Sequence, residues 1–217
     1  AVVFVDNDWF LFDPTWDIGK TSGFKFFKKT GNEFIETHTP FDPLWRIQNY
    51  PNSNRKGNKL LYVNYKDSID IYLASDSLIR LESATRRITK SKIDRTSTDT
   101  HLKVLKNDLE IKREEEQMEW FNLAVEKMNT ATRILNNFID LRNGNFNTVT
   151  DFSSLHLMLE SMDRELDSAN SFLDKVDQSK ATLVYGTAPA REQLKKLRTK
   201  HSDQIFFLNK FLAENRR

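Results

Sequence analysis

The feature of this sequence that most constrains the fold is a heptad repeat of apolar residues between positions 155 and 176. Apolar side chains recur there at alternating steps of four and three: Leu155, Leu159, Met162, Leu166, Ala169, Leu173 and Val176. On a helix this spacing puts them all on one side, as a seam that has to be buried against another helix. The sequence therefore predicts a helix that begins at Thr150 or Asp151. Its seam pairs within the chain or, as an alternative, with a second copy.

Helical periodicity also marks the segments on either side of this seam. A helix is expected from Asp67 or Ser68 to roughly Ile93, because a Ser or Asp side chain caps a helix and apolar residues then recur at helical spacing. The inward positions predicted for it are Ile69, Leu73, Leu81 and Ile88. A longer helix is expected from about His101 to Arg142. It stops at Asn143-Gly144-Asn145, since Gly and Asn accept a left-handed cap.

The last helix is expected to follow the break at Gly186 to Pro189 and to run to about Glu214, because proline is tolerated in the first turn of a helix. Its predicted inward positions are Leu194, Leu197, His201, Ile205, Leu208 and Leu212. Long helices joined by short breaks favour a mainly antiparallel bundle or long helical hairpins. Residues 59–217 are accordingly predicted to be a helical domain.

The first seventeen residues follow a different pattern. Two apolar runs, Val2–Val5 and Trp9–Phe12, flank the polar break Asp6-Asn7-Asp8, which predicts a tight antiparallel hairpin. The second run ends at Asp13-Pro14, and proline pushes the residue before it into an extended conformation. A carboxylate at a strand end is placed to orient another group. Alternatively, it bonds the backbone of its own turn. With the helices, this hairpin makes the predicted fold class α+β.

Two segments near the start of the chain resemble a known family. Asp8-Trp-Phe-Leu-Phe-Asp-Pro-Thr-Trp-Asp17 is similar to the end of a transglutaminase-like core. Phe34-Ile-Glu-Thr-His-Thr-Pro-Phe-Asp-Pro-Leu-Trp-Arg46 is similar to a segment of bacterial members related to kyphoscoliosis peptidase. The resemblance covers roughly residues 1–48 of the sequence. It implies that residues 1–58 are the C-terminal portion of such a core, a small antiparallel sheet. The stretch from Asn49 to Asn58 is the predicted linker.

What the resemblance implies chemically is a Cys-His-Asp site for acyl transfer or peptide-bond hydrolysis, acting on a protein or peptide substrate. Only the carboxylate carries over to this sequence, as Asp13, and Trp16 would line the substrate site. The Cys and His are expected upstream of Ala1. The sequence has no cysteine, so this chain alone is expected to be inactive, and whether the protein is an enzyme stays open. The alternative is a non-catalytic scaffold whose helical domain binds a protein partner.

The histidines give no independent site. His38 is interpreted as a loop histidine that bonds backbone near its turn, because a general base needs a nucleophile within reach. Trp45 is interpreted as a buried anchor, with a role in substrate binding as the alternative. His101, His156 and His201 lie on predicted helices without metal-ligand spacing, so no metal or cofactor is expected. His201 is expected to be a hydrogen-bonded core or boundary residue.

The amino-acid composition bears on which classes of partner the protein can bind. Lys and Arg number 33 against 31 Asp and Glu, a net charge of +2 that gives no general attraction for nucleic acid. No apolar run is long enough for a membrane span, and no signal peptide is recognised. Export to the periplasm or the cell exterior of a bacterium is suggested by the family resemblance alone.

Overall fold

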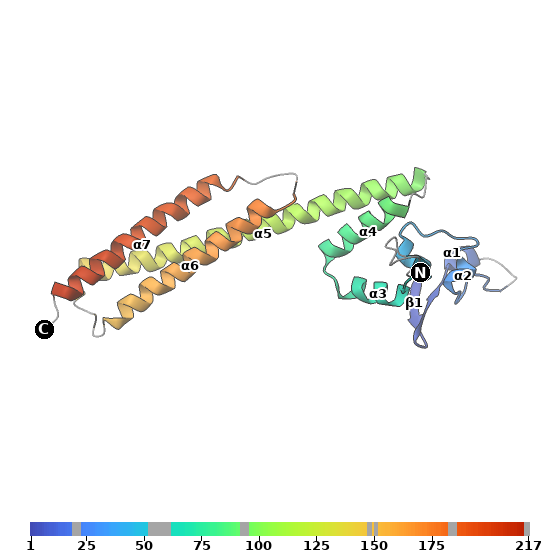
Figure 1. Cartoon of the computed structure of the whole chain (residues 1–217), viewed down its shortest axis with the longest axis horizontal. Helices are drawn as coiled ribbons and strands as arrows, with labels where there is room; N and C mark the ends of the chain where they lie inside the picture. Colours follow the sequence, from blue (N-terminus) through green and yellow to red (C-terminus); the bar gives the residue numbers. More distant parts are fainter. Residues whose placement is uncertain are drawn as a thin grey trace, which may run out of the picture. The chain divides into compact units, whose positions relative to one another are not determined.

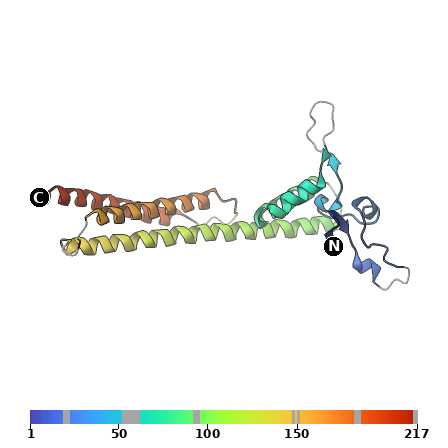
Figure 2. The same cartoon turned by 90° about the horizontal axis from the view of Figure 1, so that it is seen from below.

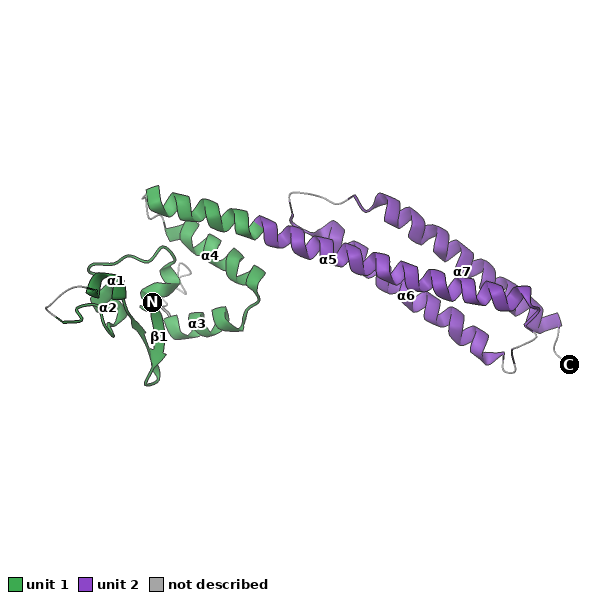
Figure 3. Cartoon of the chain, turned by 180° about the vertical axis from the view of Figure 1, so that it is seen from behind, with its two compact units in different colours: residues 1–109 green, residues 110–217 purple. Residues whose placement is uncertain are grey.

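The protein is mainly helical with a small antiparallel β-sheet, an α+β structure. The computed structural model describes residues 1–18, 23–51, 62–91, 96–146, 149, 152–181 and 186–214 (Figures 1 and 2). The chain forms two compact units, Ala1–Leu109 and Glu110–Arg217 (Figure 3). The sequence places a domain boundary between residues 58 and 59. That position, like most of the predicted linker, lies outside the described residues, and the boundary stays a prediction.

The first unit opens with the predicted hairpin. Strands β1 (Val2–Val5) and β2 (Asp8–Leu11) pair antiparallel, with Val2 opposite Leu11 and Val5 opposite Asp8. Asp6 and Asn7 form the turn, with φ angles of 54° and 63°, and two-residue hairpin turns need positive values of this kind. Two further strands, β3 (Tyr50–Pro51) and β4 (Tyr62–Val63), pair with each other in a second small sheet.

Three short helical turns follow the hairpin, and each is started by a side-chain cap. They are α1 (Pro14–Asp17), α2 (Gly31–Phe34) and the 3-10 turn η1 (Pro43–Arg46). The carboxylates of Asp13 and Asp42 cap α1 and η1, and Thr30 forms a capping box with Glu33. Gly31 has to be glycine, because a Cβ there would lie 2.2 Å from the carbonyl oxygen of Arg46. These turns enclose a small core made of Leu11, Phe26, Phe34 and Ile47.

The predicted helix from Asp67 or Ser68 to Ile93 is wrong as a single helix. It is two helices, α3 (Tyr65–Ala74) and α4 (Ser77–Ser91), and Asn64 caps the first. The break lies at Ser75 and Asp76, where the Asp76 carboxylate accepts from the backbone N–H of Ile79. Ile69 and Ile88 are buried as expected, whereas Leu73 is 50% exposed. Because the helix is interrupted at Ser75 and Asp76, the helical spacing of buried residues in α3 does not continue into α4.

The second unit is built from the long helix α5 (Thr96–Asn143) beyond Leu109, together with α6 (Ser153–Gln178) and α7 (Ala188–Glu214). Helix α6 runs antiparallel to both neighbours: Gln117 of α5 bonds Val176, and His201 of α7 bonds Leu159. Every residue of the predicted heptad seam is buried. The seam packs against α5 and α7 of the same chain, so pairing with a second copy through this seam is wrong.

The stripe predicted for α7 is correct except at one position. Ile205 is 38% exposed, and the neighbouring Gln204 is buried instead. The Gln204 side-chain carbonyl accepts a hydrogen bond from Arg142 at 2.9 Å. This bond replaces one that the buried amide would otherwise make with water. His201 is buried and hydrogen-bonded, as expected. None of the described helices is both long and apolar enough to span a bilayer.

Candidate functional site: a carboxylate–imidazole pair beside an aromatic groove

Asp13 is held where β2 gives way to α1. Its own N–H donates to the carbonyl oxygen of Phe26 at 3.1 Å. Its Oδ1 atom accepts from the N–H groups of Thr15 at 3.0 Å and Trp16 at 3.3 Å, which satisfies two donors at the start of α1. The sequence left open whether Asp13 serves its own turn or orients another group. One carboxylate oxygen serves the turn, and the second remains for another partner.

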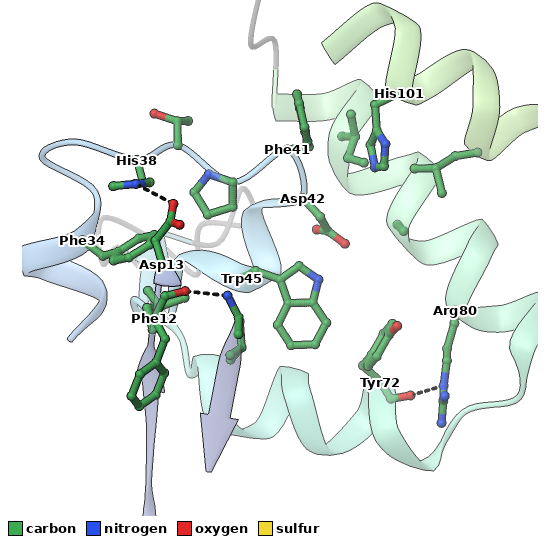
Figure 4. A pocket seen from close by; sticks show the side chains of 18 of the residues that line it. Phe12, Asp13, Phe34, His38, Phe41, Asp42, Trp45, Tyr72, Arg80 and His101 are labelled. Carbon is green, nitrogen blue, oxygen red and sulfur yellow. Dashed lines mark hydrogen bonds and ion pairs between the residues drawn. The ribbon is translucent and has the colours of Figure 1, made fainter. Parts of the chain in front are cut away.

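The partner of the second oxygen is His38. Asp13 Oδ2 lies 3.0 Å from His38 Nε2 (Figure 4). The other ring nitrogen, Nδ1, lies 2.7 Å from the hydroxyl oxygen of Thr37. An ionised carboxylate only accepts, so Nε2 carries the proton; in the neutral ring Nδ1 then accepts from the Thr37 hydroxyl. The contacts therefore define one tautomer of the imidazole.

Aromatic rings fix the plane of the His38 imidazole. The Phe34 ring stacks on it with centroids 4.2 Å apart, and Phe26 and Trp16 approach at 4.8 and 4.9 Å in edge-to-face geometry. The side chains of His38 and Asp13 are 15% and 21% exposed. Partial burial strengthens the hydrogen bond relative to one in water, because the effective dielectric is lower. The pair is thus held in position and is still open to solvent.

The pair lies in the wall of a groove of about 700 Å³ in the first unit. We call this the aromatic groove, and its lining includes Phe12, Asp13, His38, Phe41, Trp45, Tyr72 and His101. Figure 4 shows Trp45 and Tyr72 on the side opposite Phe12 and Asp13. Their rings meet edge to face at 5.2 Å. Such a cavity, mostly apolar with a few polar groups, is typical of a ligand site.

A second acid–base pair supports the far side of the groove. Asp42 is 7% exposed, and both its oxygens bond the Arg87 guanidinium, at 2.7 and 2.6 Å. The same carboxylate accepts from the N–H of Leu44 in capping η1. Arg80 is also committed, since it donates to the carbonyl oxygens of Tyr72 and Leu73 at the end of α3. These charges join α4 to η1 and to α3, and they shape the groove.

The hairpin is tied to α3 by a carboxylate–phenol bond outside the groove. Tyr65 donates its hydroxyl to Asp8 Oδ1 at 2.9 Å. Burial, followed by this bond, raises the pKa of Tyr65 to about 12. The backbone N–H of Trp9, with help from the Tyr65 hydroxyl, holds the pKa of Asp8 below its usual value. The bond fixes the hairpin and with it the strand that carries Asp13.

The site residues named from sequence lie close together. Asp13 is at the groove, as the resemblance implies. Trp16 touches the His38 ring, but it is not among the groove-lining residues and its ring is half exposed. Trp45 lines the groove and is only partly buried. The interpretation of His38 as a histidine whose ring bonds backbone is wrong, because both ring nitrogens face side chains. The separation of 25 positions between Asp13 and His38 follows no spacing rule that would have predicted the pair.

Metal binding has no geometric support in the described ranges, where His, Asp and Glu side chains nowhere gather in a group of three or more suited to an ion. Comparison with protein-family models gives no match to the chain, and neither curated proteins nor solved structures show a significant similarity.

Proposed function

We propose that residues 1–58 belong to a transglutaminase-like core in which Asp13 orients a catalytic imidazole for acyl transfer or hydrolysis of a peptide bond. The observation that supports this is that the two oxygens of the Asp13 carboxylate bind different groups. Oδ1 is anchored by two N–H groups of its own turn, and Oδ2 holds an imidazole at the wall of a groove. A carboxylate in this position selects the tautomer of the ring it binds.

In the proposed reaction a thiolate attacks the acyl carbon, an imidazole takes the thiol proton and returns it to the leaving group, and Asp13 stabilises the imidazolium. The thiol and a further imidazole would come from residues encoded upstream of Ala1. A carboxylate oxygen has two lone pairs, and Oδ2 uses one of them on His38. The remaining lone pair can accept a hydrogen bond from a second imidazole.

The test begins with the residues encoded upstream of Ala1, where a Cys at a helix start and a His shortly before Ala1 are expected. In a protein that includes them, Asp13→Asn is the informative variant. An Asn side chain caps a helix about as well as Asp, so the α1 turn is kept while the negative charge is lost. We expect a fall in kcat of roughly 10²–10⁴-fold, as for other orienting carboxylates.

Two controls make this experiment decisive. The unfolding midpoint of the Asp13→Asn protein should stay near the parent value, and Asp6→Asn, in an exposed ion pair with Lys28, should leave kcat unchanged. An Asp13→Asn protein that loses stability and turnover in equal measure would make Asp13 a structural residue.

The second candidate is a non-catalytic scaffold with a helical protein-binding unit. It is favoured by the fact that Asp13 is hydrogen-bonded entirely within this chain, to its own turn and to His38, so its position needs no catalytic role. The second unit also presents apolar side chains to solvent, with Phe206 of α7 74% exposed. If the upstream sequence lacks both the Cys and the His, the non-catalytic scaffold is the candidate that remains.

A further inference from the structure

Strand β1 has an open edge. Ala1 and Phe12 exchange backbone hydrogen bonds, at 2.9 and 2.6 Å. Hydrogen-bonded and non-bonded pairs alternate along an antiparallel ladder, so Val3 and Val5 also direct their backbone groups toward β2. Val2 and Phe4 direct theirs the other way. Across the described part of the chain, no hydrogen bond engages the backbone N–H or C=O of Val2 or Phe4.

Strand β1 is only four residues long, but its edge lacks the other features that protect an edge strand. Residues Val2–Val5 include no proline and no charged side chain, and their register with β2 is regular, without a bulge. Val3 is 40% exposed and Phe4 is 52% exposed. The other edge of the hairpin is already paired, because Leu11 exchanges two backbone bonds with Lys29.

The open edge adjoins the aromatic groove. Ala1 and Val2, at the start of β1, line the groove together with Trp45 and Tyr72. An extended strand lying along β1 would therefore continue past Val2 into the groove and reach the wall that holds Asp13 and His38. Donors and acceptors that alternate at strand spacing are matched by another β-strand and by few other ligands.

We propose that this edge and the groove bind an extended polypeptide by β-strand addition. The peptide backbone pairs with Val2 and Phe4, and an apolar or aromatic side chain of the peptide enters the groove. Backbone pairing supplies affinity without sequence preference, and the groove supplies the preference for a bulky apolar residue. This binding needs no thiol. It does need the β1 edge to stay free of the residues that the proposed function places upstream of Ala1, and slow exchange of the Val2 and Phe4 amides in a free protein that includes those residues would overturn it.

Amide hydrogen exchange in the full chain tests the proposal directly. The probe is a blocked heptapeptide of alternating leucine and threonine, added at up to roughly 1 mM, because short peptides commonly bind in the micromolar to millimolar range. In the free protein the amides of Val2 and Phe4 should exchange fast, and those of Val3 and Val5 slowly. At nine-tenths saturation the peptide should slow exchange at Val2 and Phe4 by about tenfold, since only the free tenth of the protein still exchanges fast.

The matched control changes the ligand and leaves the protein untouched. The same peptide with every backbone amide N-methylated loses all the donors that pair with a strand, and it should give no protection. Val2→Pro should also weaken binding at least tenfold, because it removes an N–H that β2 does not use and proline is tolerated on such an edge. Val3→Thr, which changes a side chain and no edge donor, should bind like the parent.

Three further outcomes would overturn the proposal. They are equal binding of the N-methylated peptide, binding without protection at Val2 and Phe4, and a concentration-dependent dimer of the free protein that protects these two amides. The last result would assign the edge to a second copy of the chain. None of these results bears on the Asp13→Asn turnover test, so the proposed catalytic function and this binding mode can fail separately.

Discussion

The two units of this protein are stabilised in different ways. The second unit, Glu110–Arg217, has a continuous apolar core in which Leu166, Ala169 and Leu173 are all at 0% exposure. The first unit, Ala1–Leu109, has a small aromatic core and depends on polar side chains that bind backbone or each other: Asp13, Asp17 and Asp42. Stability in the second unit therefore comes from the apolar area that is buried. In the first unit it comes from a few specific bonds, which also position the candidate site.

The largest effect is expected in the second unit. Leu166→Ala should lower the free energy of unfolding by about 4 kcal/mol, because a fully buried leucine leaves both its transfer free energy and a cavity. Leu157→Ala on the same helix, at a position 59% exposed, should cost about 0.5 kcal/mol or less. Denaturant unfolding followed by circular dichroism measures both. Similar losses of unfolding free energy for the two variants would contradict the conclusion that the seam forms the core of this unit.

The next effect concerns the first unit and a polar residue. Asp42→Ala should lower the free energy of unfolding by about 3 kcal/mol. It leaves the partly buried Arg87 guanidinium without its carboxylate partner and also removes the cap of η1. Asp6→Ala breaks an exposed ion pair with Lys28 and should cost about 0.5 kcal/mol. Tryptophan fluorescence in a Trp120→Phe background reports on this unit, since the other three tryptophans, Trp9, Trp16 and Trp45, lie in it. Equal, small losses would contradict the idea that polar bonds hold the first unit.

A smaller effect is expected where the hairpin meets α3. Tyr65→Phe removes the hydroxyl bond to Asp8 and should cost about 1 kcal/mol. The pKa of Tyr65 is raised from 10.0 to about 12, so its contribution is complete below pH 10 and is lost as the pH rises toward 12. Ultraviolet absorbance of tyrosinate follows the titration. Tyr72→Phe, whose hydroxyl has no hydrogen bond within the described residues, should leave stability unchanged.

The smallest effect concerns a polar network in the second unit, formed by Asp177, Thr187 and Arg191. The Thr187 hydroxyl, with Arg191, holds the pKa of Asp177 below its usual value of 3.8. A lowered pKa stabilises the fold above about pH 3.8, and the contribution is lost as the pH falls through the folded value. Thr187→Val should raise the pKa of Asp177, measured by carboxyl ¹³C chemical shift, and should move acid unfolding to slightly higher pH. Thr199→Val, on the exposed side of α7, is the control, and an unchanged Asp177 titration in Thr187→Val would refute the assignment.

The comparison of the units also explains what the sequence could predict. In the second unit, burial follows helical periodicity, so the seam from Leu155 to Val176 and the α5 residues Ala124, Met128 and Phe138 could be identified from spacing alone. The error at Ile205 arose because Gln204 is buried through a bond to Arg142, and no hydrophobic pattern encodes that bond.

In the first unit, the rules for turns and helix caps predicted local structure, but they did not predict which side chains pair across the fold. The hairpin was predictable from its turn residues, and the capping role of Asp13 from Asp-Pro chemistry. The pairs Asp13 with His38, and Asp42 with Arg87, join residues far apart in sequence. The α3–α4 break was missed because Asp76 and Arg80 end one helix and begin the next through side-chain bonds. Such bonds depend on tertiary position, and for that reason the candidate site could be named only in part.

The most direct test of the account is the tautomer of His38, read from long-range ¹H–¹⁵N correlation of the imidazole in the intact chain near neutral pH. If Asp13 fixes the ring, Nε2 carries the proton and Nδ1 does not, and Asp13→Ala shifts both nitrogen resonances toward those of a mixed population. A proton on Nδ1 in the parent protein, or a spectrum that Asp13→Ala leaves unchanged, would contradict the claim that this carboxylate orients an imidazole at the groove.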